Sequence, residues 1–257
     1  MSRPALAVLV LALVFLLGPF LVVFLAGFSG DETLAFPPRS WGWRWMAYVF
    51  TVESFQRSFV TSMIVGVGST LAALGLGVPV AYALARARVP GRELVRTILT
   101  LPLIVPGIIV GLALLRHMVL LYDLPVVASL LIGHTALLVP YAVRVVSASL
   151  ANLRADIDDA AVSLGATRWQ AFVKVVMPNI RGGIAAAAVL AFITSFNQVP
   201  VSLFLTGPGV STLPIEMMAY METSYDPSIA ALSTLLVVFT IAVVAATEKL
   251  LGISRYV

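Results

Sequence analysis

The sequence contains no cysteine, so disulfide bonds and thiolate metal sites are excluded. Charged residues are scarce, at 11% of the chain against roughly 25% in soluble proteins, which leaves no region polar enough for a separate soluble domain. The only two histidines, His117 and His134, supply no ligand set for a metal-dependent membrane enzyme. Hydrophobic residues make up 60% of the chain instead, and the mean hydropathy is +1.04. We therefore expect residues 1–257 to form a single transmembrane domain.

Apolar stretches long enough to cross a bilayer recur along the chain, separated by charges or by glycine and proline clusters. They lie at residues 4–28, 58–85, 97–115, 124–143, 182–206 and 228–247. Backbone groups in lipid must be satisfied within the segment, and each stretch is about twice the length of a barrel strand. The sequence therefore predicts an all-α integral membrane protein with six transmembrane helices. The first stretch exceeds the roughly 7–15 apolar residues of a cleavable signal sequence, so we expect it to be retained.

Basic residues are distributed unevenly between the predicted loops, and cytoplasmic loops are the ones that retain Lys and Arg. With the N-terminus inside, the inner segments hold twelve of the sixteen basic residues: Arg3, Arg86, Arg88, Arg92, Arg96, Arg144, Arg154, Arg168, Lys174, Arg181, Lys249 and Arg255. The outer segments hold four basic residues against seven acidic ones. We therefore predict that both termini are cytoplasmic. The net charge of +4 then reflects topology rather than nucleic-acid binding, since no basic stretch is interleaved with aromatic residues.

The most informative polar segment lies in a predicted cytoplasmic loop at 144–181. It reads Asp159-Ala160-Ala161-Val162-Ser163-Leu164-Gly165 and is followed nine residues later by Val175-Val176-Met177-Pro178. Acidic residues favour the start of a first helix, Gly165 favours its end, and Thr167 can cap a second helix that Pro178 ends. The loop is thus predicted to form a compact helix–turn–helix with small residues at its tip. The alternative is an ordinary amphipathic connection that places these side chains in the inner leaflet: Trp169, Phe172, Val173 and Val176.

The same segment resembles the EAA loop of bacterial ABC-importer permeases, whose pattern is Glu-Ala-Ala, three residues, Gly, nine residues and Ile-x-Leu-Pro. Asp159, Val175 and Met177 replace Glu, Ile and Leu, and the spacing agrees at every step. The stretch from Ser195 to Gly209, with Thr212-Leu213-Pro214, looks like the equivalent part of polyamine-type permeases, the spermidine/putrescine family and its aminoalkylphosphonate and opine relatives. The resemblance covers essentially the whole chain.

The resemblance implies the transmembrane subunit of a type I ABC importer, multi-pass in the bacterial inner membrane. Such a subunit pairs with a second permease, usually a non-identical one. It receives solute from a periplasmic or lipid-anchored binding protein and is driven by two cytoplasmic ATPase subunits that bind ATP and Mg. Because this chain has no G-x-x-x-x-G-K-[ST] loop, we expect no cofactor and no catalytic residue in it. The family's ATPase-docking role carries over to Asp159, Ala160, Ala161 and Gly165, with Pro178 as a structural element.

Polar side chains are few inside the predicted spans, and such residues are the default candidates for a transport pathway. Asn197 and Gln198 lie just before Pro200, which loosens the local hydrogen-bond ladder, and Ser195 and Tyr141 are further candidates. The alternative role for the two amides is hydrogen bonding between helices, worth about 0.6 kcal/mol. Polyamine-carrying relatives often place carboxylates near this position. We therefore expect an amine-bearing cargo: a polyamine, an aminoalkylphosphonate, an opine or an amino-acid derivative. The neutral amides here favour the zwitterions or monocations among these over a polyamine.

A rival interpretation is a secondary transporter or a channel that works without an ATPase. It requires an ionisable coupling site at a span centre or inverted repeats with broken helices, and the sequence shows neither. His134 stands alone in its span, and a proton relay needs a chain of partners. We therefore predict that His134 is a buried, neutral packing residue.

Overall fold

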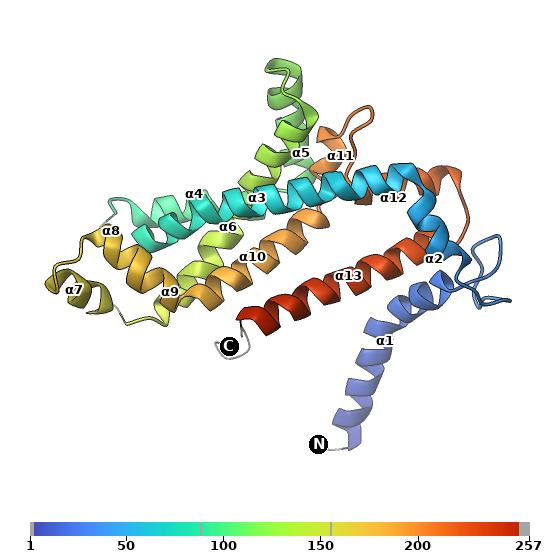
Figure 1. The fold of residues 1–257 in the computed structure, drawn as a ribbon, viewed down its shortest axis with the longest axis horizontal. Coiled ribbons are helices and arrows are strands. Elements are labelled where there is room, and N and C mark those ends of the chain that lie inside the picture. The colour runs from blue at the N-terminus through green and yellow to red at the C-terminus, as the bar shows by residue number, and fades with distance from the viewer. Residues whose placement is uncertain (1–2, 88, 155, 252–257) are drawn as a thin grey trace. The chain divides into compact units, whose positions relative to one another are not determined.

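The computed structural model describes residues 3–87, 89–154 and 156–251, and within these ranges the regular elements are helices, with only two isolated β-bridges (Figure 1). The elements are α1 (Arg3–Gly27), α2 (Arg44–Tyr48), η1 (Val49–Thr51), α3 (Glu53–Arg86), α4 (Arg92–Ile104), α5 (Gly107–Leu114), η2 (Leu115–Leu121), α6 (Val126–Ala151), α7 (Asp156–Ser163), α8 (Arg168–Ala171), η3 (Phe172–Val176), α9 (Met177–Asn179), α10 (Arg181–Phe196), α11 (Ser202–Leu205), α12 (Leu213–Thr223) and α13 (Ser228–Leu251). The segment η1 is a 3₁₀-helix, whereas η2 and η3 are π-helices. The predicted all-α class is confirmed. Arg88 and Arg255, two of the predicted cytoplasmic cations, lie outside the described ranges.

The six predicted spans correspond to four unbroken helices and two bent pairs. Within the described ranges, α1, α3, α6 and α13 are each long and apolar enough to cross a membrane. The third predicted span is divided into Arg92–Ile104 and Gly107–Leu121, which meet at 96°. The fifth is preceded by the helical segment Arg168–Asn179, which meets α10 at 74°. Helix α6 continues through Ala151, well past the predicted end of the fourth span at residue 143.

Proline accounts for the break between α4 and α5. Pro106 has no backbone N–H and disfavours helix in the residue before it, and Val105 is indeed extended, with φ −73° and ψ 131°. By contrast, Pro79 and Pro102 remain inside α3 and α4. The fifth predicted span is also interrupted, because α10 ends at Phe196 and α11 begins only after Pro200.

The chain divides into two compact units. The first comprises Met1–Arg57 with Glu216–Ala242, and the second comprises Ser58–Ile215 with Val243–Val257. In the first unit, Gly27 of α1 lies so close to α13 that an added Cβ would be 3.0 Å from Ala230 O. Trp45 Nε1 donates to Asp31 O at 2.8 Å, which ties the loop after α1 to α2. The segments with motif resemblance lie in the second unit.

The main core of the second unit forms between α3, α6, η3 and α10, and α6 and α10 lie side by side (Figure 1). Its buried residues are Val78, Ala81, Leu84, Val143, Val146, Leu150, Phe172, Val176, Ile180 and Ala187. Small residues permit the close packing: an added Cβ on Gly77 would lie 2.7 Å from Ala142 Cβ, and one on Gly183 would lie 2.4 Å from Ser149. Close backbone approach of this kind is how helices associate in lipid, where no hydrophobic force drives them together. This core packs the end of α3 against the end of α6 and Leu153, which follows it.

Candidate functional site

Residues 156–179 form a helical projection, which we term the knob, built from α7, a turn, and a second helix made of α8, η3 and α9. Gly165 ends α7 with a φ of +94°, a left-handed conformation that glycine adopts without strain. Its N–H donates to Val162 O at 2.9 Å, and the N–H of Ala166 donates to Ala161 O at 3.1 Å. These two bonds are a Schellman motif, which satisfies the carbonyls at the end of a helix. The predicted end of the first helix at Gly165 is confirmed.

The second helix of the knob begins at the predicted cap. Thr167 Oγ1 accepts from the N–H of Gln170 at 3.2 Å, and Gln170 Oε1 accepts from the N–H of Thr167 at 2.9 Å, which completes a capping box. The predicted role of Pro178 as the helix end is not observed, because Pro178 lies inside α9 and the break follows at Ile180. The wider π-turns of η3 immediately precede this proline, where a regular α-helix would clash with its ring.

A buried ion pair fastens the knob to the end of α3. Arg86 Nε lies 3.0 Å from Asp158 Oδ2, with side-chain exposures of 15% and 3%. Arg86 Nη2 also donates to Leu153 O at 2.9 Å, so one guanidinium joins α3, the end of α6 and the knob. The sequence pattern did not predict this pair, and the available signal was an acidic residue, Asp158, on the face of α7 that also has to pack.

The three acids of α7 differ in exposure, since Asp158 is buried whereas Asp156 and Asp159 are exposed. Burial raises the pKa of Asp158, and the nearby Arg86 guanidinium partly offsets this. The pKa of Asp156 is lowered, chiefly by its hydrogen bond from Arg154. Asp159 accepts from Arg168 Nη1 at 2.9 Å on the knob surface. Despite these neighbouring acids, no group of three His, Cys, Asp or Glu that could hold a metal occurs in the described part of the chain.

The surface of the knob combines small and large apolar residues. Of the predicted docking residues, Asp159, Ala160, Gly165 and Pro178 are exposed and Ala161 is half-buried. Two residues that sequence analysis did not assign to docking stand beside them: Leu164 is 91% exposed and Trp169 is 67% exposed. In the alternative membrane-surface arrangement Phe172 and Val176 would enter the leaflet, whereas both are buried in the core of the second unit. The knob therefore presents a small-residue tip flanked by two apolar side chains. Whether the predicted residues dock on a partner stays a prediction.

The predicted pathway residues gather near the break between α10 and α11, with one exception. Asn197 is exposed, and its Nδ2 donates to Ile193 O at 3.1 Å. Gln198 is half-buried beside it, whereas Ser195 is buried. Tyr141 lies elsewhere, on α6, packed at the edge of the cluster of Ala73, Leu138 and Ala191. The structure thus offers the two amides at an interruption of the helix.

A buried hydrogen-bond network holds both sides of this interruption. His134, only 1% exposed, contacts Ser195 Oγ through Nδ1 at 2.8 Å and Ser202 Oγ through Nε2 at 3.0 Å. Ser202 Oγ donates to Gln198 O at 2.6 Å, so in the neutral ring Nε2–H donates to Ser202 and Nδ1 accepts from Ser195. Ser69 of α3 lies 3.1 Å from Ser195 Oγ. The predicted burial of His134 is confirmed. The hydrogen bonds by which His134 links α10 and α11 could not be predicted from a single histidine in the sequence.

The chain is similar in sequence to known transport proteins. Residues 73–251 match the family described as "Binding-protein-dependent transport system inner membrane component". The chain is 32% identical to the probable ABC transporter permease protein y4oR of Sinorhizobium fredii (strain NBRC 101917 / NGR234), over 84% of this chain and 78% of that protein. It is 29% identical to the putrescine transport system permease protein PotI of Escherichia coli (strain K12), over 89% of this chain and 84% of that protein.

Solved structures share the fold at low sequence identity. A chain of a bacterial ABC transporter that imports the acidic polysaccharide alginate superimposes with a TM-score of 0.72 at 19% identity, covering 97% of this chain and 98% of that one. A chain of the MetNI methionine ABC transporter in an inward-facing conformation gives a TM-score of 0.63 at 20% identity, covering 82% and 98%. Since these two transporters are named for different cargoes, the fold does not identify a substrate.

Proposed function

Because this chain belongs to the family of binding-protein-dependent transport system inner membrane components, and is therefore a permease subunit of an ABC importer, we propose that its cargo is a small amine-bearing solute. The observation that carries the proposal is the likeness to the putrescine permease PotI over 89% of the chain. The neutral amides of Asn197 and Gln198 narrow the class, since a dication in a low-dielectric pathway gains most from carboxylates. A zwitterion or monocation, such as an aminoalkylphosphonate, an opine or an amino-acid derivative, suits two amides better than a polyamine does.

We further propose that the knob transmits force from partner ATPases. Two cytoplasmic ATPase subunits bind ATP and Mg, and closure of their dimer draws together the knobs of this chain and a second, non-identical permease. The buried Arg86–Asp158 pair and the shared core make the knob move with α3 and α6. Rocking of these helices then exchanges inward-facing and outward-facing states. Moving such an equilibrium from 1:99 to 99:1 requires roughly 5.5 kcal/mol of differential ATP binding.

The proposed arrangement places this subunit in the bacterial inner membrane with both termini in the cytoplasm. On the outer side, a periplasmic or lipid-anchored binding protein delivers the solute. The proposed topology is supported by the excess of basic residues in the inner segments, and the proposed location by a family that is described as an inner membrane component.

The assembly is tested by affinity purification of the tagged chain from its native membrane in mild detergent, followed by mass spectrometry. Recovery of an ATPase, a second permease and a binding protein supports the proposal, and a ligand that accompanies the binding protein identifies the cargo. Recovery of the folded chain alone favours a transporter that works without an ATPase.

Replacement of the two amides is expected to slow uptake without affecting assembly. One hydrogen bond is worth about 1 kcal/mol, so Asn197→Ala and Gln198→Ala should each lower the rate of solute uptake about fivefold if the amides line the pathway. The measurement is uptake of labelled solute, with recovery of the partner subunits as the assembly readout.

Thr247→Ala is the matched control, because Thr247 Oγ1 also donates to a carbonyl four residues earlier, Val243 O, at 2.7 Å, and lies outside the knob. This variant removes the same local bond away from the α10–α11 break and should transport normally. Unchanged uptake in the Asn197 and Gln198 variants would reduce both amides to a packing role.

A further inference from the structure

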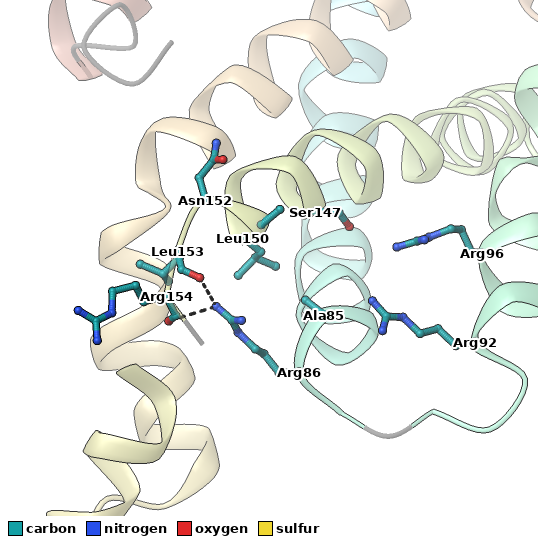
Figure 2. A pocket seen from close by; sticks show the side chains of 10 residues that line it. Ala85, Arg86, Arg92, Arg96, Ser147, Leu150, Asn152, Leu153 and Arg154 are labelled. Carbon is teal, nitrogen blue, oxygen red and sulfur yellow. Dashed lines mark hydrogen bonds between the residues drawn. The ribbon is translucent and has the colours of Figure 1, made fainter. Parts of the chain in front are cut away.

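A half-open pocket of about 450 Å³ lies in the second unit, where the ends of α3 and α6 meet the start of α4 (Figure 2). Its volume is within the range of about 300–1,000 Å³ that is common for small-molecule sites. Four arginines line it, namely Arg86, Arg92, Arg96 and Arg154, and no carboxylate does so within the described ranges. A pocket with this lining attracts anions rather than an amine-bearing solute.

Two of the four arginines are already committed to the fold. Arg86 pairs with Asp158 and donates to Leu153 O (Figure 2). Arg154 pairs with Asp156, and its guanidinium points away from the pocket in Figure 2. The anion-binding capacity of the pocket therefore depends on the remaining pair, Arg92 and Arg96.

Arg92 and Arg96 extend from the first turns of α4 toward α6 (Figure 2). Arg96 has one solvent-exposed pairing, with Glu93 at 3.6 Å, and within the described ranges no ion pair or hydrogen bond reaches the Arg92 guanidinium. The two cations are four residues apart on one helix, a spacing at which like charges repel. Across the pocket, Ser147 of α6 adds a hydroxyl (Figure 2). An anion between these groups would relieve the repulsion.

The N-terminal end of α4 also favours a bound anion. Its N-cap residue, Gly91, has no side chain that could accept from the free N–H groups of the first turn. The helix dipole is positive at this end, so the two arginines are opposed by the dipole as well as by each other, and Glu93 is the acidic residue that the first turn supplies. A bound anion would neutralise the dipole and both cations at once.

We propose that this pocket binds a phosphate group through Arg92 and Arg96. Guanidinium groups bind phosphate oxygens in pairs of parallel hydrogen bonds, a geometry that suits phosphate better than a halide. Basic pockets between transmembrane helices on the cytoplasmic side accept phospholipid headgroups. The phosphate can therefore belong to an anionic phospholipid, or to a soluble phosphate from the cytoplasm.

The test uses the full chain purified in an uncharged detergent and native mass spectrometry, which requires no transport activity. Phosphatidylglycerol, phosphatidylcholine and inorganic phosphate are titrated separately. The test variant is Arg92→Gln with Arg96→Gln. The matched control is Arg144→Gln with Arg181→Gln, which removes two exposed cations from the same predicted side of the membrane and outside the pocket. Loss of one cation near an anionic lipid surface costs about fivefold, so the test variant should bind roughly thirtyfold more weakly.

The outcomes separate the two sources of phosphate. Phosphatidylglycerol that binds with one-to-one stoichiometry and is weakened only in the test variant, while phosphatidylcholine binds less tightly, supports a lipid headgroup. Saturable binding of inorganic phosphate with the same dependence on the variants supports a soluble phosphate. Equal binding of every probe to the test and control variants overturns the proposal. Circular dichroism of both variants establishes that the helices are retained.

Discussion

Solute uptake is expected to fall to background, and the partner ATPase is expected to be lost from the purified complex, when Ala161→Asp and Gly165→Pro are combined. Gly165 has a φ of +94°, which the proline ring cannot adopt, and its N–H donates to Val162 O. Loss of this turn costs roughly 3 kcal/mol or more, and the new carboxylate at the half-buried position 161 would have to be desolvated on docking. Uptake and ATPase co-purification are measured together, on protein shown to be inserted in the membrane.

Gly209→Pro provides the matched control for backbone strain. Gly209 also has a positive φ, +76°, and has open space around it, but it lies in the loop between α11 and α12. This variant should retain the ATPase. If the double variant inserts correctly and still binds the ATPase and transports solute, the docking role of the knob is contradicted.

The second large effect is expected at the buried ion pair. Arg86→Met leaves the Asp158 carboxylate, 3% exposed, without its ion-pair partner and removes the hydrogen bond to Leu153 O. Removal of one partner from a buried pair costs about 3–5 kcal/mol. Because the pair fastens the knob to α3, the loss should appear locally, as hydrogen exchange of the α7 amides at least about a hundredfold faster. Uptake should fall with it.

Asp158→Asn is expected to be much milder, because the Arg86 guanidinium, 15% exposed, keeps its bond to Leu153 O. The raised pKa of Asp158 also indicates that the fold tolerates loss of the negative charge at this position. A carboxyl that holds its proton more tightly in the folded state stabilises the fold most in acid, and this contribution is lost as the pH rises through the raised pKa. The wild type should therefore lose stability between acid and neutral pH relative to Asp158→Asn.

Two further variants test this asymmetry. The double variant Arg86→Met with Asp158→Asn should restore slow exchange in α7, since no unpaired buried charge remains. Arg154→Met serves as the control, because its pairing with Asp156 is solvent-exposed and contributes little. Equal acceleration of exchange in Arg86→Met and Arg154→Met would show that the buried pair does not hold the knob.

The residue pattern alone was sufficient to predict the class of the protein, the positions of its apolar segments and the local shape of the knob. These features depend on local signals. A run of about 20 apolar residues has to satisfy its backbone hydrogen bonds within the segment in lipid, which favours helix even where a proline breaks the run. Gly165 and Thr167 set helix ends through bonds to residues at most five positions away. The motif spacing that indicated the family is likewise contained within 159–178.

Tertiary packing determines which proline interrupts a helix and which groups from distant parts of the chain meet. Pro102 and Pro106 have the same ring, yet α4 continues past the first and ends before the second, because neighbouring packing determines whether the lost bond is tolerated. Arg86 meets Asp158, and His134 bridges Ser195 and Ser202, across segments that are remote in the chain. Partners at such separations are selected by the packing of α3, α6 and α10, for which the order of residues carries no local signal.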